Sequence, residues 1–246
     1  MVRKLALVLP LALAALAFAA AAGGGRSAAR SATLAPGHAP NHKISHSTST
    51  NWSGYSAING RYTSVSGSWK QPTASCTSQS TYASFWVGLD GDGSNTVEQT
   101  GTSADCSGGT PRYYAWYEMY PKFPVNLSLA IRPGDSMSAS VTTSGSGRFV
   151  LTIRNTTTGG SFQTTQTLKR ARLASAEAIA EAPSSSGGVL PLTNFGTVSF
   201  SSVTVNGQAI GAFNPDRIDM VSNGVTKAST STLSGGNAFS VTWKHS

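Results

Sequence analysis

Short runs in which apolar and polar residues alternate recur throughout residues 48–246, and this period-2 pattern constrains the fold more than any other feature. Turn dipeptides such as Asp92-Gly93, Pro133-Gly134, Asn206-Gly207 and Asn223-Gly224 separate the runs. Many short strands joined by tight turns, without βαβ spacing or an internal repeat, predict an all-β fold, an antiparallel β-sandwich. The runs are Tyr62–Trp69, Tyr82–Asp90, Tyr113–Tyr120, Asn126–Ile131, Phe149–Asn155, Thr197–Val205 and Ala238–Lys244.

Leu168–Ala182 departs from this pattern. It is rich in alanine, with leucine, lysine, arginine and glutamate, and such residues predict a helix that ends before Pro183. Alternation instead places Glu177, Ile179 and Glu181 on one face of a strand. On propensity alone the helix is favoured.

The N-terminal region divides into two parts before the predicted domain. Residues 1–22 carry basic residues and then an apolar run rich in alanine and leucine, the pattern of a secretory signal peptide. Residues 23–47 contain almost no large apolar side chain, so we interpret them as a linker or a short propeptide. Residues 48–246 then form one domain. We expect a secreted, extracellular protein with no stable membrane association after signal cleavage.

The formal net charge of +8 does not indicate a nucleic-acid partner. Five of the 18 basic residues precede Thr48, which leaves 13 against 10 acidic residues in the domain. Such a weak excess with a single small basic cluster is typical of a solvated surface. The two cysteines, Cys76 and Cys106, accompany an export signal, and we therefore predict that they form a disulfide.

The positions of the four histidines exclude several hydrolytic mechanisms. His38, His42, His46 and His245 lie before the predicted domain or at its last-but-one residue. No histidine is then held within the fold for a Ser-His-Asp or Cys-His site, and a zinc site built on imidazoles is disfavoured. We predict neither a metal nor a cofactor.

Four of the ten carboxylates lie in or at the ends of apolar or aromatic runs: Asp90, Glu118, Glu177 and Glu181. Burial among such residues disfavours the charged form of an acid. Acids flanked by aromatic side chains suit glycosidases, which use two carboxylates across a sugar bond. They equally suit acid peptidases, in which a carboxylate activates water and a neutral donor holds the oxyanion. Composition does not decide between these classes.

Specific strings favour the peptidase, because the chain resembles the glutamic peptidase (eqolisin) family along residues 51–200. The strings occur in the family's order, and together they are far more specific than any one of them. They are Asn51-Trp52-Ser53-Gly54, Phe85-Trp86-Val87-Gly88-Leu89-Asp90-Gly91, Glu98-Gln99-Thr100-Gly101, Ala115-Trp116-Tyr117-Glu118-Met119-Tyr120-Pro121, Ala176-Glu177-Ala178-Ile179-Ala180-Glu181 and Phe195-Gly196-Thr197-Val198-Ser199-Phe200.

The resemblance implies a curved sandwich of two sheets, concanavalin- or jelly-roll-like, with the active site on its concave face. It implies that Gln99 and Glu181 are the catalytic pair, and it places the segment around Glu181 in a strand. Ionised Glu181 would take a proton from the attacking water while the Gln99 amide donates to the oxyanion. The substrate-binding residues would be Asn51, Trp52, Trp86, Asp90, Trp116 and Glu118.

The resulting prediction is a secreted, monomeric acid endopeptidase that acts on protein or peptide substrates. Ala178 stands where the family usually has an aromatic residue, and Ala182-Pro183 replaces an acidic-aromatic pair, so these positions affect the expected pocket shape. Two other interpretations stay open. One is a carbohydrate-active or carbohydrate-binding sandwich in which Trp86 and Trp116 stack on sugars. The other is an exported module whose peptidase site has decayed.

Overall fold

The computed structural model describes Gly37 and residues 47–246. The predicted signal peptide, residues 1–22, and most of the predicted linker, residues 23–47, lie outside this part. Within the described residues no helix is long and apolar enough to cross a membrane. The elements are β1 (Thr48–Ser49), β2 (Trp52–Ala57), β3 (Ser64–Lys70), β4 (Ser84–Leu89), β5 (Val97–Ser107), β6 (Thr110–Tyr120), β7 (Val125–Leu127), β8 (Ser136–Thr143), β9 (Arg148–Asn155), β10 (Ser161–Thr167), β11 (Ala176–Glu181), β12 (Ser184–Ser185), β13 (Gly188–Val189), β14 (Thr197–Val205), β15 (Gln208–Ala209), the 3-10 helix η1 (Ile210–Phe213), β16 (Asp216–Ser222), β17 (Val225–Thr230) and β18 (Phe239–Trp243).

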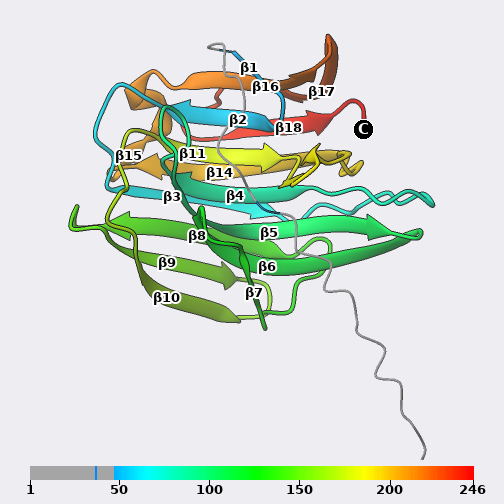
Figure 1. The fold of residues 1–246 in the computed structure, drawn as a ribbon, viewed down its shortest axis with the longest axis horizontal. Helices are drawn as coiled ribbons and strands as arrows, with labels where there is room; N and C mark the ends of the chain where they lie inside the picture. The colour runs from blue at the N-terminus through cyan, green and yellow to red at the C-terminus, as the bar shows by residue number, and fades with distance from the viewer. Residues whose placement is uncertain (1–36, 38–46) are drawn as a thin grey trace, which may run out of the picture. The chain divides into compact units, whose positions relative to one another are not determined.

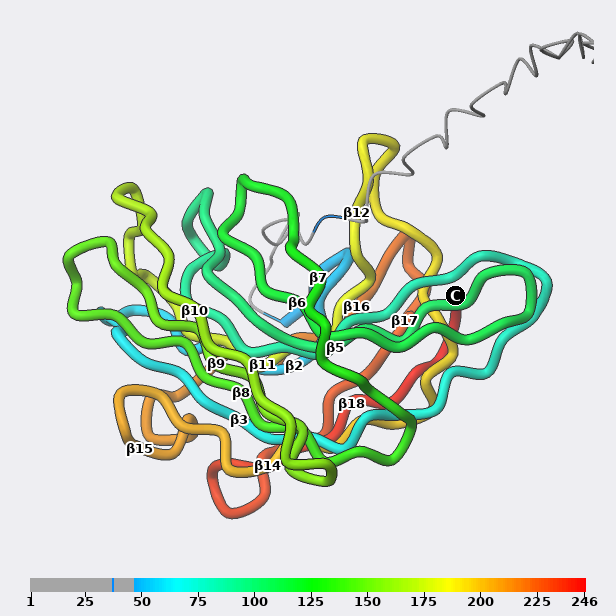
Figure 2. The backbone as a smooth tube through the Cα atoms, turned by 90° about the horizontal axis from the view of Figure 1, so that it is seen from below, coloured from blue at the N-terminus to red at the C-terminus, as the bar shows by residue number. Residues whose placement is uncertain are grey.

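One continuous sheet contains nearly all of these strands, in the order β10-β9-β8-β3-β14-β18-β17-β16-β2-β11-β4-β5-β6-β7. Strand β16 pairs with β17 on one side and with β2 on the other, so the sheet folds into two layers (Figure 1). We call β2, β11, β4, β5, β6 and β7 the site layer, and β10, β9, β8, β3, β14, β18 and β17 the supporting layer. Figure 2 shows the two curved layers edge-on. The predicted all-β antiparallel sandwich is confirmed.

The burial of each strand follows its place in these layers. Strands β3, β8 and β9 alternate between buried and more exposed residues, because one face packs on the core and the other faces solvent. Strands β2, β4 and β11 are buried at every position. Their second face is covered by an apolar cluster of Trp52, Trp86, Val97, Trp116, Ile179 and Ile218.

Two of the predicted turn dipeptides form two-residue hairpins. Asn206-Gly207 joins β14 to β15, with φ of 48° and 79°, and Asn223-Gly224 joins β16 to β17, with φ of 51° and 77°. Both positions of such a turn need a left-handed backbone, which asparagine and glycine tolerate best. The local sequence therefore sets these connections.

The helix expected from the composition of Leu168–Ala182 is wrong, and the strand implied by the family resemblance is confirmed. Residues Ala176–Glu181 form β11, which pairs antiparallel with β2 on one side and β4 on the other. Ala176, Ala178 and Ala180 pack in the core between the layers. Pairing with a strand on each side and burial of the alanines outweigh an intrinsic helix preference of a few tenths of a kcal/mol per residue, about the range separating good from poor helix formers. The predicted run Asn126–Ile131 is also shorter than expected, since β7 ends at Leu127.

The predicted disulfide between Cys76 and Cys106 is confirmed, with 5.4 Å between the Cα atoms. It joins the segment between β3 and β4 to the end of β5. In the chain-entropy model, closing this loop stabilises the fold by about 3 to 4 kcal/mol.

Candidate active site

The second face of the site layer presents its residues in three transverse rows, because residues paired directly across neighbouring strands share a face. The rows cross β2, β11, β4, β5 and β6 in that order. The first row is Ser56, Glu177, Gly88, Gln99 and Glu118. The middle row is Gly54, Ile179, Trp86, Gly101 and Trp116. The third row is Trp52, Glu181, Ser84, Ser103 and Tyr114.

In the first row Gln99 and Glu177 lie on either side of Gly88. Two strand spacings separate their Cα atoms, which is about 10 Å in a regular sheet. Gly88 itself has no side chain, and the edge of the Trp86 indole and Gln99 Cβ lie over it, 2.9 and 3.0 Å from where a Cβ would be. Gln99 Nε2 donates a hydrogen bond of 2.9 Å to Glu118 Oε2, so the acid on β6 orients the amide. The row brings an amide between two buried carboxyl groups.

Glu177 is a fully buried acid with one oxygen uncommitted. Ser56 Oγ donates to its Oε1 at 3.4 Å, while Oε2 has no hydrogen-bond partner among the described residues. Burial raises the pKa of Glu177 well above its usual value, the Ser175 hydroxyl opposes this shift, and the negative charges of Asp92 and Asp90 add to it. A carboxylate here would be a stronger base than a solvated one.

Glu181 lies in the third row, four residues along β11 from Glu177, or about 13 Å at the usual rise per residue. The indole Nε1 of Trp86 donates to its Oε2 at 2.8 Å, and Asn51 Nδ2 donates to its Oε1 at 3.4 Å. Burial raises the pKa of Glu181 well above its usual value, and these hydrogen bonds lower it. The structure therefore groups Glu181 with Asn51, Trp86 and Trp52 and does not place it opposite Gln99.

Of the remaining predicted site residues, Trp116 lies on the acid-bearing face and Asp90 lies beyond the end of β4. Trp116, in the middle row, is buried and its Nε1 donates to Ser103 Oγ at 3.0 Å. Asp90 follows β4, and its carboxylate accepts the backbone N–H groups of Arg172, Leu173 and Ala174 at 2.8 to 2.9 Å. Asp90 thus fixes the segment that leads into β11.

The two departures from the family pattern lie on the opposite side of β11 from its acids. Ala178 pairs with Tyr55 and Val87 and packs in the core between the layers, as Ala182 also does. The small residue at position 178 therefore changes core packing directly, and the acid-bearing face only through it. The expectation that Ala178 shapes the substrate pocket is not supported by this placement.

Gly37, from the segment that precedes the domain, lies against the first row. Its N–H donates to the Ser184 carbonyl and the Ser184 N–H donates to its carbonyl, each at 2.8 Å. A Cβ placed on Gly37 would lie 4.0 Å from Glu118 Oε1. This antiparallel bridge places Gly37 at the edge of the candidate site.

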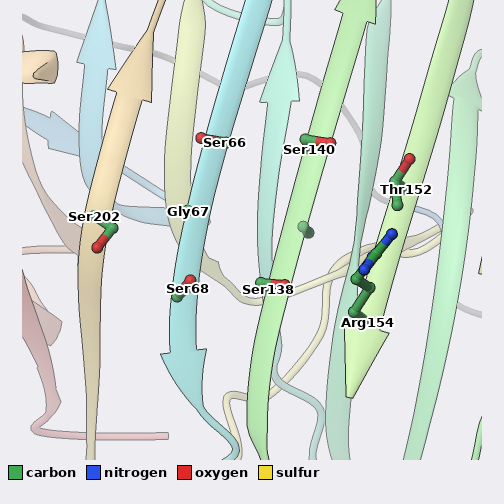
Figure 3. A pocket seen from close by; sticks show the side chains of 9 residues that line it. Ser66, Gly67, Ser68, Ser138, Ser140, Thr152, Arg154 and Ser202 are labelled. Atoms are coloured by element: carbon green, nitrogen blue, oxygen red, sulfur yellow. The ribbon is translucent and has the colours of Figure 1, made fainter. Parts of the chain in front are cut away.

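A separate depression of about 240 Å³ lies on the outer face of the supporting layer (Figure 3). It is a hydroxyl-rich trough with one arginine, and it contains none of the candidate site residues. Its lining is Ser66, Gly67, Ser68, Ser138, Ala139, Ser140, Thr152, Arg154 and Ser202.

The fold and the acid-bearing face together place the protein among β-sandwich hydrolases. The sequence model of the Peptidase A4 family matches residues 50–243, and the chain belongs to this family. It is 29% identical to Aspergillopepsin-2 of Aspergillus niger over 79% of this chain and 78% of that protein. It is 37% identical to Scytalidopepsin B of Scytalidium lignicola over 58% of this chain and 57% of that protein.

Solved structures agree with this assignment. Scytalido-glutamic peptidase with a transition state analog inhibitor matches with a TM-score of 0.68 and 28% identity, over 79% of this chain and 98% of that one. Aspergilloglutamic peptidase from Aspergillus niger matches with a TM-score of 0.61 and 30% identity, over 67% and 99%. The protein is therefore a peptide hydrolase of the glutamic type, which decides between the two reaction classes that composition left open.

Sequence reasoning did not assign a role to Glu177. The sequence feature that points to Glu177 is the alternation that puts Glu177 and Glu181 on one face of the strand. Choosing between them requires the register of β11 against β4 and of β4 against β5, and no local pattern specifies that register.

Proposed function

We propose that this peptidase cleaves peptide bonds with Gln99 and Glu177, with Glu118 as the residue that orients Gln99. The observation that carries this proposal is the first row, in which Gln99 and Glu177 face each other across Gly88. The pairing of Gln99 with Glu181, expected from the sequence motif, is the alternative. This alternative has less geometric support, because Glu181 lies four residues from Glu177 along β11. Its carboxylate also accepts hydrogen bonds from Trp86 and Asn51.

In the proposed mechanism Glu177, ionised, takes a proton from a water molecule as that water attacks the substrate carbonyl. The Gln99 amide has two N–H groups. One donates to Glu118, and in the proposed mechanism the other donates to the developing oxyanion when substrate is bound. Collapse of the tetrahedral intermediate breaks the C–N bond, and Glu177 returns its proton to the leaving amine.

We expect Gln99→Ala to lower kcat/KM for an unstructured peptide by about 100- to 1000-fold, the usual effect of losing one oxyanion donor. The matched control is Gln163→Ala, since Gln163 is an exposed strand glutamine on β10 of the supporting layer. Both variants should keep the wild-type melting temperature within a few degrees. Near-wild-type turnover by Gln99→Ala would refute the assignment of the oxyanion donor.

We also propose that the segment containing Gly37 acts as a propeptide that blocks the site. The two-bond bridge to Ser184 is how an extended peptide adds to an exposed strand, and it lies beside Glu118. A substrate backbone that used the same edge would compete with this segment. The predicted export of the chain, from residues 1–22, fits the Cys76–Cys106 disulfide, which persists in oxidising compartments.

Removal of this segment is expected to raise activity. A chain beginning at Thr48 should show a higher kcat/KM on a short unstructured peptide than one beginning at Gly23, and a synthetic peptide of residues 31–47 should inhibit it competitively. A peptide of the same composition in scrambled order is the control. Equal activity of the two chains at equal melting temperature, with no inhibition by the peptide, would show that the segment is only a linker.

A further inference from the structure

Glu98 is a buried acid that the proposed mechanism does not use. It directly precedes Gln99 on β5 but points to the opposite face, into the core between the layers. Its cross-strand partners are Leu89 on β4 and Met119 on β6, both buried in that core. Its exposed fraction is 0%, neither carboxyl oxygen makes a hydrogen bond of good geometry among the described residues, and the polar side chains nearest to it are those of Asp90 and Thr96. An ionised carboxylate in such a position is strongly disfavoured.

The charges around Glu98 add to this penalty. Burial, followed by the negative charge of Asp90, raises the pKa of Glu98 to about 9. Glu177 on β11 lies close enough to interact electrostatically with it. Strands β8 and β9 pack across the core from β5, and their buried side chains are apolar apart from Asn155 at the end of β9, while Arg148 and Arg154 are exposed. We find no compensating positive charge on these elements.

Asp90 links Glu98 to the candidate active site. Besides accepting three backbone N–H groups from residues 172–174, Asp90 donates its own N–H to the Ser175 carbonyl at 3.0 Å. Residue 175 is followed directly by β11, which carries Glu177 at its second position. A second negative charge beside Asp90 would repel the carboxylate that holds this segment in place.

We propose that Glu98 is a positioning residue that must be uncharged, so that neutral Glu98 lets Asp90 hold residues 172–175 and keeps β11 in register with the candidate site. Loss of its proton in the core then loosens this segment and destabilises the fold. The effect on activity rests on the function proposed above, whereas the effect on stability does not.

The direction of the pH dependence follows from the raised pKa. A folded-state value of about 9 against an ordinary value of 4.5 means that the folded protein holds a proton that the unfolded chain releases. The stabilisation is complete below pH 4.5 and is lost as the pH rises towards 9. Between pH 4.5 and pH 9, the Glu98 carboxyl lowers the folding equilibrium constant by up to about tenfold for each unit of pH increase.

The test compares wild type, Glu98→Gln and Asp219→Asn between pH 3.5 and pH 9. Glu98→Gln keeps the shape of the side chain and removes its charge. Asp219 is a half-buried acid on β16 that accepts the Thr230 N–H, a bond that asparagine can preserve, so its variant is the control. We expect Glu98→Gln to match the wild-type melting temperature near pH 4 and to exceed it by at least about 5 °C at pH 8. Asp219→Asn should follow the wild-type curve.

Hydrogen exchange at the amides of Arg172, Leu173 and Ala174 provides a readout specific to the positioning role. Corrected for intrinsic rates, their protection should fall above pH 8 in wild type and persist in Glu98→Gln. The pH at which peptidase activity is lost should shift upward in the same variant. Melting curves of wild type and Glu98→Gln that stay parallel across the pH range, or unchanged amide protection, would overturn the proposal even if the enzyme proved active.

Discussion

Glu177→Gln is expected to lower kcat/KM for an unstructured peptide by about 100- to 10 000-fold, the range typical of removing a general base. The substitution keeps the shape of a buried side chain that accepts a hydrogen bond from Ser56, so the fold should persist. The measurement is steady-state hydrolysis of a short peptide together with the melting temperature.

Glu181→Gln is the matched control, because it makes the same change on the same face of the same strand. We expect it to reduce turnover by no more than about tenfold, since the single amide oxygen can still accept from Trp86, and only the longer hydrogen bond from Asn51 loses its acceptor. If Glu181→Gln abolished hydrolysis while Glu177→Gln kept it, the base would be Glu181, as the sequence motif implied, and the proposed mechanism would be wrong.

The pH dependence of the wild-type rate tests whether a buried carboxylate is the base, whereas the two variants above distinguish Glu177 from Glu181, because burial raises the pKa of both acids. A general base works only when it is ionised, so the rate should rise with pH through the pKa of Glu177. Because burial raises that pKa, the acidic limb of kcat/KM should lie above pH 4.5, the ordinary value for glutamate. The apparent constant belongs to the group of interacting acids and not to one residue.

Gly88→Ala is expected to produce the second large effect, a loss of at least about tenfold in kcat, because small displacements of catalytic groups are costly. A Cβ at this position would lie 3.0 Å from Gln99 Cβ and 2.9 Å from Trp86 Cζ3, so both side chains must move. Gln99 would then leave the position in which Glu118 orients it. The measurement is kcat and KM on the same peptide.

The control for this prediction is Gly93→Ala, in the turn between β4 and β5. Gly93 has φ of 79°, and a Cβ there would meet nothing within 4 Å, so its variant should lose stability through backbone strain without displacing Gln99. If the two variants lost stability equally and Gly88→Ala kept full turnover, Gly88 would matter only for packing.

Much of this protein follows from its sequence alone. Alternation and Asn-Gly turns specify an antiparallel all-β fold, because side-chain direction along a strand and backbone conformation in a tight turn are local properties. The predicted export signal together with two cysteines was enough to predict the Cys76–Cys106 bridge, and ordered motifs were enough to indicate the family. The alternation also placed Glu177 and Glu181 on the same face of one segment.

Only the tertiary structure decided what those residues face. Leu168–Ala182 has the composition of a helix, yet it contributes a central strand, which pairs with β2 and β4 while its alanines fill the core between the layers. Strand register, which is set by packing between segments far apart in the chain, puts Gln99 opposite Glu177 and leaves Glu181 with Trp86. The same register directs Ala178 into the core. It also places the backbone N–H groups of residues 172–174 where they donate to the Asp90 carboxylate. Register is a long-range property, and a shift of one residue would exchange the two faces of β11.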